Sequence, residues 1–381
     1  MKHPIRFPSG KERILLITAA VCLLTAGILA VLSAGICNSQ PSQQMATRWD
    51  GEGGSAQISC FFSNGLEITP DTIRGFEYTL KNQLQEASVE APSENARLWS
   101  SAYSARGQIT LSSSLSRVDA VAYGVGGDYF PFHPLTLKPG SMYFGSDDMM
   151  QDRVILDQNT AWQLFGSYDI AGQPITIGSG PDSHIGVVAG VIESETGFMN
   201  EKAGAATGTV YLSYEMLNTY GRHSGINTYE IVMPNPITGF ARGMVADHIG
   251  FEEEEIQIVE NSERFSFLNL LSVLGQFGTR SMNTKAIIYP YWENAARGWE
   301  DILSVLLAVQ ILLLIFPVVL LIRWVRMAWK ARTFHFSDVK NWLADMQEAH
   351  WARQAERKDR LKNEKEPKIK KNGIKKGRNK E

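Results

Sequence analysis

Two long stretches without a charged side chain constrain most strongly what this chain can fold into. They are residues 14–36 and residues 302–322 of the 381-residue sequence. A helix rises about 1.5 Å per residue, so either stretch is long enough to cross a bilayer core roughly 30 Å thick. The sequence therefore predicts two transmembrane helices with a large domain between them.

The first stretch has a cleaved signal peptide as its alternative, because Ser33 and Gly35 resemble the small residues of a cleavage site. Signal peptides have apolar regions of only about 7–15 residues, which favours an uncleaved anchor. Cys37 follows Ile36 rather than a small residue, so a lipid-modified cysteine is the weaker interpretation.

Aromatic and basic residues flank the second stretch. Amphipathic rings prefer membrane–water interfaces, and arginines at the end of a span reach lipid phosphates. Arg323 and Arg326 follow the stretch directly. The flanking rings are Tyr289, Tyr291, Trp292, Trp299, Trp324 and Trp329. This pattern is typical of a membrane span rather than of a buried core helix.

The net charge of −3 conceals a basic, acidic, basic layout. Residues 1–13 carry a net charge of +3, residues 37–322 carry −16 and residues 323–381 carry +10. Lysines and arginines close to a span mark its cytoplasmic end. We therefore predict a double-pass protein of a cell membrane, with both termini in the cytoplasm and the acidic domain outside.

The predicted organisation has six parts, of which the second and fifth cross the membrane. Residues 37–55 are polar and rich in glycine towards their end, which is typical of a tether. The parts are a cytoplasmic N-terminus (1–13), a transmembrane helix (14–36), a tether (37–55), an extracytoplasmic domain (56–298), a transmembrane helix (299–323) and a basic cytoplasmic tail (324–381).

The outer domain begins with a pattern of strand, turn and helix. Residues 56–62 are β-prone, and Thr69 and Pro70 provide a cap and a first helical residue. One apolar face then recurs at helical spacing. Its members are Ile73, Phe76, Leu80 and Leu84.

The same pattern returns far downstream. Residues 228–233 read as a strand, Asn235 and Pro236 as the start of a helix, and residues 255–259 as a further strand. The expected helix face is Ile237, Ala241, Met244, Val245 and His248. Two such units commonly pair into one sheet, so we predict an α+β fold with a split βαβ, ferredoxin-like subdomain flanked by the two membrane helices.

Between the two units, residues 121–209 read as an inserted β-rich subdomain. Strands are expected at residues 154–157, 174–177 and 185–192, with one short helix at residues 159–165. After the second unit, residues 265–277 predict an apolar helix or helix pair that leads back to the membrane.

The sequence shows no pattern that predicts catalysis, a cofactor or a metal. It contains no phosphate-binding loop, so we expect no ATPase domain in it. Residues 124–128 lack the third glycine of a dinucleotide fingerprint and are expected to form a turn. The histidines of the outer domain have no ligand spacing, and its acidic runs read as solvated surface. These are His133, His184, His223 and His248, and the acidic residues 147–148 and 252–255.

Three cysteines leave the disulfide question open. Cys22 lies inside the first predicted span, whereas Cys37 and Cys60 lie in a compartment that allows a bridge. A bridge between these two and a pair of unrelated thiols are equally compatible with the sequence.

The tail combines an amphipathic helix, residues 337–355, with a basic segment after Arg357. The helix rests on the inner leaflet or docks on a cytoplasmic partner, and the basic segment is expected to bind anionic membrane lipids rather than nucleic acid. The cap and apolar face of the helix are Ser337, Val339, Trp342, Leu343, Met346 and Ala349.

A series of short motifs runs through residues 124–191. A strand leads into a glycine-rich turn that ends in two aromatic residues, and a leucine and a glycine follow. A strand and helix come next, ending in Leu-Phe-Gly, and then two β-like segments, the last with Ala189 inserted. The residues concerned are Gly124, Val125, Gly126, Gly127, Asp128, Tyr129, Phe130, Leu137, Gly140, Val154, Leu156, Ala161, Leu164, Phe165, Gly166, Gly172, Ile175, Ile177, Gly178, Val187, Val188, Ala189, Gly190 and Val191.

In order and spacing these motifs resemble the MacB-like periplasmic core domain of permeases of the FtsX-like ABC transporter family. The resemblance implies a non-catalytic outer domain that transmits motion, or binds a substrate or partner, in an ATP-driven assembly. Its expected partners are an ABC ATPase and a multi-span permease subunit, or a second copy of the chain. Members usually have three further membrane helices after the domain and this sequence has one, so the resemblance is to a shortened relative. The alternatives are a stand-alone surface binding or sensing module and, third, an extracytoplasmic enzyme.

Overall fold

A computed structural model describes residues 10–91, 93, 96–145, 151–194, 197–205, 208–280, 285–331, 344–354 and 356. The chain divides into two compact units, Met1–Leu314 and Ile315–Glu381. The second unit contains the later part of the second long helix and a helical segment at residues 344–354. Most of the predicted N-terminus, the acidic pair 147–148, Trp342 and the tail after residue 356 lie outside the described residues.

Two long helices, α1 (Gly10–Asn38) and α10 (Tyr291–Ala331), contain the two predicted spans. Only 11% of the most apolar segment of α1 and 6% of that of α10 are buried, so neither helix is the core helix of a soluble domain. The two helices meet at Ser33 and Gln310, where the Gln310 amide donates to the Ser33 hydroxyl at 3.3 Å. The chain is thus a membrane protein with a large domain between two spans.

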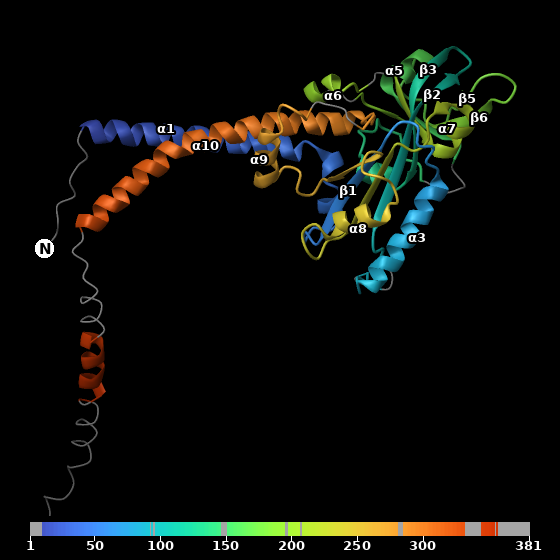
Figure 1. Ribbon diagram of the computed structural model, residues 1–381. Coiled ribbons are helices and arrows are strands. Elements are labelled where there is room, and N and C mark those ends of the chain that lie inside the picture. Colours follow the sequence, from blue (N-terminus) through green and yellow to red (C-terminus); the bar gives the residue numbers. More distant parts are fainter. Residues whose placement is uncertain are drawn as a thin grey trace, which may run out of the picture. The chain divides into compact units, whose positions relative to one another are not determined.

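The predicted ferredoxin-like subdomain is present. Its four strands follow the order β10-β1-β9-β2, and every neighbouring pair is antiparallel (Figure 1). Each half has one helix that connects its two strands, and these two helices contact each other. The elements are β1 (Ser55–Phe62), α3 (Pro70–Glu86), β2 (Ser100–Ser112), β9 (Thr228–Pro234), α8 (Phe240–His248) and β10 (Ile256–Glu260).

Helix α3 forms as its sequence predicts. The Thr69 side chain accepts a hydrogen bond from the backbone N–H of Thr72, and Pro70 occupies the first turn, where no intrahelical donor is needed. Its buried side chains are Ile73, Phe76, Leu80 and Leu84, which is the predicted face. Helix α8 differs, because it begins at Phe240 after Gly239, and Ile237 is exposed. Asn235 still caps it from outside, since its side chain accepts from the N–H of Ala241.

The β-rich insert lies between β2 and β9 and closes on itself. From β2 the order continues β3-β7-β4-β6-β5, and β5 returns to pair with β2 at Leu111 and Ser112. Strand β2 therefore belongs to both parts of the described sheet. The elements are β3 (Arg117–Gly127), α4 (Tyr129–Phe132), β4 (Arg153–Asp157), α5 (Gln158–Phe165), β5 (Pro174–Ile177), β6 (His184–Ile192), α6 (Phe198–Lys202), β7 (Thr209–Ser213), α7 (Tyr214–Tyr220) and β8 (Arg222–His223).

The predicted turn at residues 124–128 is wrong for most of its length. Gly124, Gly126 and Gly127 end strand β3 and pair with β2. A Cβ on Gly126 would lie 2.1 Å from the ring of Tyr103, so glycine is needed here for close packing rather than for a turn.

The predicted tether is folded. A short helical turn, η1 (Pro41–Gln43), and helix α2 (Met45–Trp49) follow α1. The side chain of Gln57 in β1 accepts from the backbone N–H of Met45 and donates to the carbonyl of Ser42, both at 2.8 Å. The polar composition of residues 37–55 therefore does not indicate a flexible linker, because hydrogen bonds hold this segment on β1.

Candidate functional site

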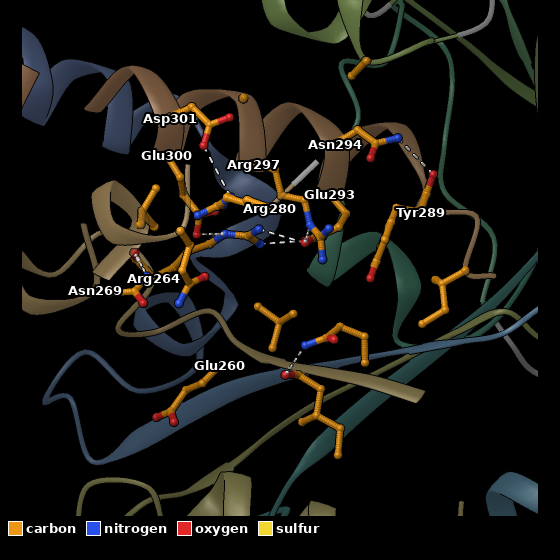
Figure 2. Close-up of a pocket in the computed structure, with 18 of the residues that line it drawn as sticks. Glu260, Arg264, Asn269, Arg280, Tyr289, Glu293, Asn294, Arg297, Glu300 and Asp301 are labelled. Carbon is orange, nitrogen blue, oxygen red and sulfur yellow. Dashed lines mark hydrogen bonds and ion pairs between the residues drawn. The ribbon is translucent and has the colours of Figure 1, made fainter. Parts of the chain in front are cut away.

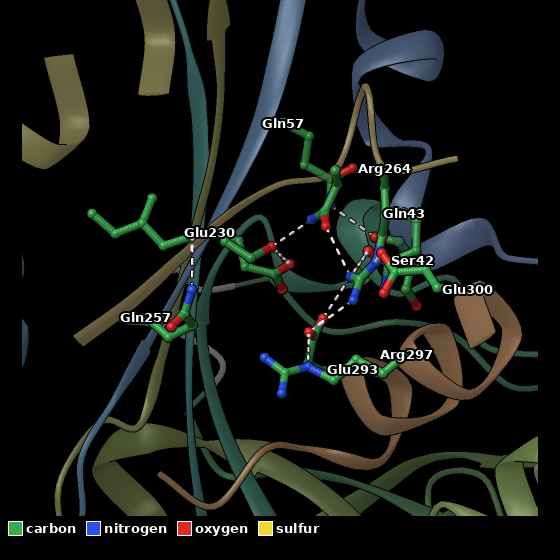
Figure 3. Close-up of polar contacts among 12 residues, drawn as sticks. Ser42, Gln43, Gln57, Glu230, Gln257, Arg264, Glu293, Arg297 and Glu300 are labelled. Carbon is green, nitrogen blue, oxygen red and sulfur yellow. Dashed lines mark hydrogen bonds and ion pairs between the residues drawn. The ribbon is translucent and has the colours of Figure 1, made fainter. Parts of the chain in front are cut away.

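A buried ionic cluster joins the start of α10 to the domain (Figure 3). The Arg264 guanidinium binds Glu293 through two hydrogen bonds of 2.6 and 2.8 Å, and its Nε donates to Glu300 at 2.7 Å. The side chains of Arg264 and Glu293 are only 2% and 1% exposed. The planar guanidinium has five fixed donors, so it fits two carboxylates at once in a way that a lysine does not.

Two further arginines complete the cluster. Arg297 lies one helical turn after Glu293 and donates to it at 2.8 Å. Arg280 binds Glu300 and lies 3.4 Å from Asp301. Each buried carboxylate therefore has two cationic partners, as a charge removed from water requires.

The protonation state of Glu293 follows from these partners. Burial raises the pKa of its carboxyl, but Arg264 and Arg297 lower it by more, so the pKa lies below the ordinary value of 4.5. For Arg280, burial lowers the pKa of the guanidinium, and the nearby Asp301 only partly offsets this. Glu293 is thus ionised at neutral pH.

A line of hydrogen bonds continues from Arg264 into the sheet. Arg264 donates to the side-chain oxygen of Asn261 at 3.1 Å, and Asn261 donates to the hydroxyl of Ser59 at 2.6 Å. Ser59 donates to Glu230 at 2.6 Å, and Glu230 in turn binds His133. The cluster is therefore connected to β1, β9 and the turn after α4.

The other membrane helix reaches the same place. Gln43, in the segment that follows α1, accepts from Arg264 at 3.1 Å. Because Gln57 also holds this segment on β1, the domain-side ends of α1 and α10 are both attached to one strand, α10 through the Arg264–Asn261–Ser59 hydrogen bonds.

An aromatic cluster holds the first turn of α10. Trp292 is buried, with its ring centroid 4.3 Å from that of His133 and 5.5 Å from that of Tyr123. Tyr123 in turn stacks on Tyr211 of β7. The prediction that Trp292 lies in a membrane interface is therefore wrong, because α10 begins well before the apolar stretch and packs its first turns on the domain.

A cavity of about 1300 Å³ lies beside the ionic cluster (Figure 2). Strand β10, the start of α10 and helix α9 (Phe267–Gly275) form its walls. Figure 2 shows Glu260 on the strand side, apart from the cluster. Burial and Glu263 raise the pKa of Glu260 above 4.5, and Arg242 only partly offsets them.

The residues considered in the sequence do not converge on a site. Within the described part of the chain, no three His, Cys, Asp or Glu side chains are placed to hold a metal ion, and the acidic run 252–255 occupies a largely exposed turn. The absence of catalytic, cofactor and metal sites stays a prediction. All three cysteines are free, and burial raises the pKa of the Cys60 thiol far above its ordinary value.

The ionic cluster was missed because its members are spread from Gln43 to Asp301 with no fixed spacing. One signal was available, since Glu300 and Asp301 stand directly before a membrane span and acidic residues there require partners.

Comparisons with solved structures give distant likenesses. The extracellular domain of YknZ, a noncanonic ABC-type transporter from Gram-positive bacteria, is 16% identical, with 53% of this chain and 99% of that domain covered and a TM-score of 0.34. The periplasmic region of MacB from Actinobacillus actinomycetemcomitans is 16% identical over 62% of this chain and 97% of that one, with a TM-score of 0.37. A domain of a permease-like protein from Porphyromonas gingivalis is 12% identical over 58% and 96%, with a TM-score of 0.31.

The family comparison is broader. No curated protein is significantly similar to the chain in sequence. The family model of the MacB-like periplasmic core domain, in contrast, matches residues 19–238, which is more than half of the chain. This match and the two flanking spans agree with the resemblance seen in the sequence, and the chain belongs to the family of the MacB-like periplasmic core domain.

Proposed function

We propose that this protein is a non-catalytic subunit of an ABC-type transport or mechanotransmission assembly, in which the outer domain passes motion to and from the membrane helices. Its partners in this proposal are an ABC ATPase together with either a multi-span permease subunit or a second copy of the chain. The family of the MacB-like periplasmic core domain supports this role.

The observation that carries the proposal is the ionic cluster at Arg264. It fixes the start of α10 and the segment after α1 to the same sheet through buried charge pairs and hydrogen bonds. A joint of this kind resists bending, because separating the charges would leave carboxylates buried without partners. Displacement of either helix would therefore move β1 and β9 with it.

Purification of the full chain from its own membranes in mild detergent tests the assembly. We expect an ATPase and a multi-span permease subunit to co-purify. Repeated recovery of the chain alone, or only with copies of itself and without an ATPase, would remove the ABC-type proposal.

Hydrogen exchange of the purified assembly tests the joint itself. Adding a non-hydrolysable ATP analogue should change the exchange of residues 256–264 in the native chain. Arg264→Lys keeps the charge but loses the two-pronged contact with Glu293, so it should reduce this change. The control Arg74→Lys alters an exposed pair with Asp71 and should leave it intact.

The cavity favours a second candidate, a surface binding or sensing module. Its volume of about 1300 Å³ leaves room for a small molecule, since ligand pockets measure about 300–1,000 Å³. A thermal shift of the purified full chain with amphipathic small molecules, in the absence of any ATPase, would support this function over the first.

A further inference from the structure

The segment between Arg264 and Arg280 exposes apolar side chains beside the second membrane helix. Its fifteen residues carry no charge, although they belong to an acidic domain. Helix α9 turns Leu270 and Val273 inwards. Four apolar side chains of the segment are exposed, Phe267, Leu268, Leu271 and Phe277, and among them lie the exposed polar residues Ser272 and Gln276. Leu268 and Phe277 stand at the edge of the segment that lines the cavity.

Both ends of this segment are attached to α10 just before its charge-free stretch begins. Arg264 and Arg280, which flank it, bind the same carboxylate, Glu300. Asp301 also lies next to Arg280, and the charge-free stretch begins at the following residue, Ile302. Figure 1 shows α9 beside the part of α10 that extends away from the sheet, and both helices line one cavity.

The polar side chains of the segment bond within it. Ser266 caps α9 by accepting from the N–H of Asn269, and the Asn269 amide donates to the carbonyl of Arg264. Gln276 donates to Ser272, and Thr279 donates to the carbonyl of Gln276. Internal bonding of this kind suits an environment with little water, where an unpaired polar group is costly.

We propose that α9 is an interfacial helix, which lies in the leaflet facing the domain and contacts lipid through Phe267, Leu268, Leu271 and Phe277. Nine residues are too few to span, whereas a short amphipathic helix readily lies along a bilayer surface. Both ends of the segment are bonded to Glu300, two residues before the charge-free stretch of α10 that is predicted to cross the membrane. Lipid is therefore the occupant, in preference to a second protein.

A fluorescent probe at Leu268 tests this contact in the full chain. The chain carries Cys22→Ser and Cys37→Ser, with Leu268→Cys labelled by a nitrobenzoxadiazole maleimide; Cys60 is fully buried and does not react. The labelled protein is reconstituted into nanodiscs of phosphatidylcholine and phosphatidylglycerol with ordinary or brominated acyl chains.

Leu115→Cys is the matched control, because Leu115 is 74% exposed and Leu268 is 75% exposed. Since interfacial helices place their apolar face about 5–10 Å into the leaflet, we expect the Leu268 probe to emit at shorter wavelength and to lose about half its intensity in brominated lipid. The Leu115 probe should show neither effect.

Two outcomes overturn the proposal. An emission at Leu268 equal to that at Leu115 would place α9 in water. A shifted emission that bromine does not quench would show that protein, such as a second copy, covers the helix. The test needs no ATPase, so its result is independent of the assembly proposed above.

Discussion

Arg264 binds two buried carboxylates, and its contribution to stability is best seen from its removal, which would leave both without this partner. A buried ion pair is not in itself more stable than a well-packed apolar pair, but removing one partner strands the other charges. Arg264→Met should therefore lower the free energy of unfolding by about 3–5 kcal/mol. Thermal or denaturant unfolding of the full chain in detergent measures it.

The control for this prediction is Arg74→Met. Arg74 pairs with Asp71 on the exposed face of α3, where an ion pair contributes about 0–1 kcal/mol. Equal effects of the two substitutions would show that Arg264 is not buried in a paired cluster.

Glu293 and Glu260 predict opposite responses to pH. The folded pKa of Glu293 is depressed, so its contribution to stability is present above pH 4.5 and is lost as the pH falls through the folded pKa. The folded pKa of Glu260 is raised, so its ionised form opposes folding at neutral pH. We expect Glu293→Gln to lower the melting temperature at neutral pH and to weaken its decline below pH 4.5.

Glu260→Gln should instead raise the melting temperature at neutral pH, and this gain should vanish below pH 4.5, where the native carboxyl is protonated in both states. Melting curves of the three proteins across this pH range measure both effects. Parallel curves would show that neither pKa is displaced.

At the scale of elements, Gly126 in strand β3 and Gly75 in helix α3 differ in the space around them. Gly126→Ala would drive a Cβ into Tyr103 and should cost about 1–3 kcal/mol. Gly75→Ala, in exposed α3 with no atom within 4 Å of the new Cβ, should instead stabilise by about 0.5–1 kcal/mol. Chemical denaturation compares the two, and equal signs would contradict the strand assignment.

Elements that carry their own periodicity were predictable from the sequence. The cap and the buried face of α3 follow from local spacing, and β5 was predicted with its exact bounds because glycines punctuate it. Local pattern found neither β2 nor β3, although the family motif implies a strand before Gly124. Both strands are rich in serine, alanine and glycine rather than in β-branched residues. The folded state of α2 depends on Gln57, which lies in another element.

The ionic cluster could not be predicted from the sequence because it depends on contacts between residues far apart in the chain. Arg264 and Glu293 are ordinary charged residues in the sequence, and only the fold brings them together. The family resemblance supplied the class of protein, but it says nothing of this cluster.

At the scale of the whole molecule, the orientation in the membrane stays a prediction. A membrane-impermeant maleimide added to cells without an outer barrier should label Leu115→Cys, since the domain is expected outside. Lys11→Cys and Met346→Cys, both exposed in the structure, should react only after the membrane is permeabilised. Each substitution is made in the chain with Cys22→Ser and Cys37→Ser, and labelling of Lys11→Cys from outside would reverse the orientation of the first helix.

The pairing of β1 with strands far along the chain has a consequence for biogenesis. Strand β1 pairs with β9 and β10, so its first partner is made only after more than 160 further residues. Such distant pairing is slow because a long loop must close first. Until β9 has been made, β1 has no partner strand, so its apolar side chains are open to aggregation while the domain is incomplete.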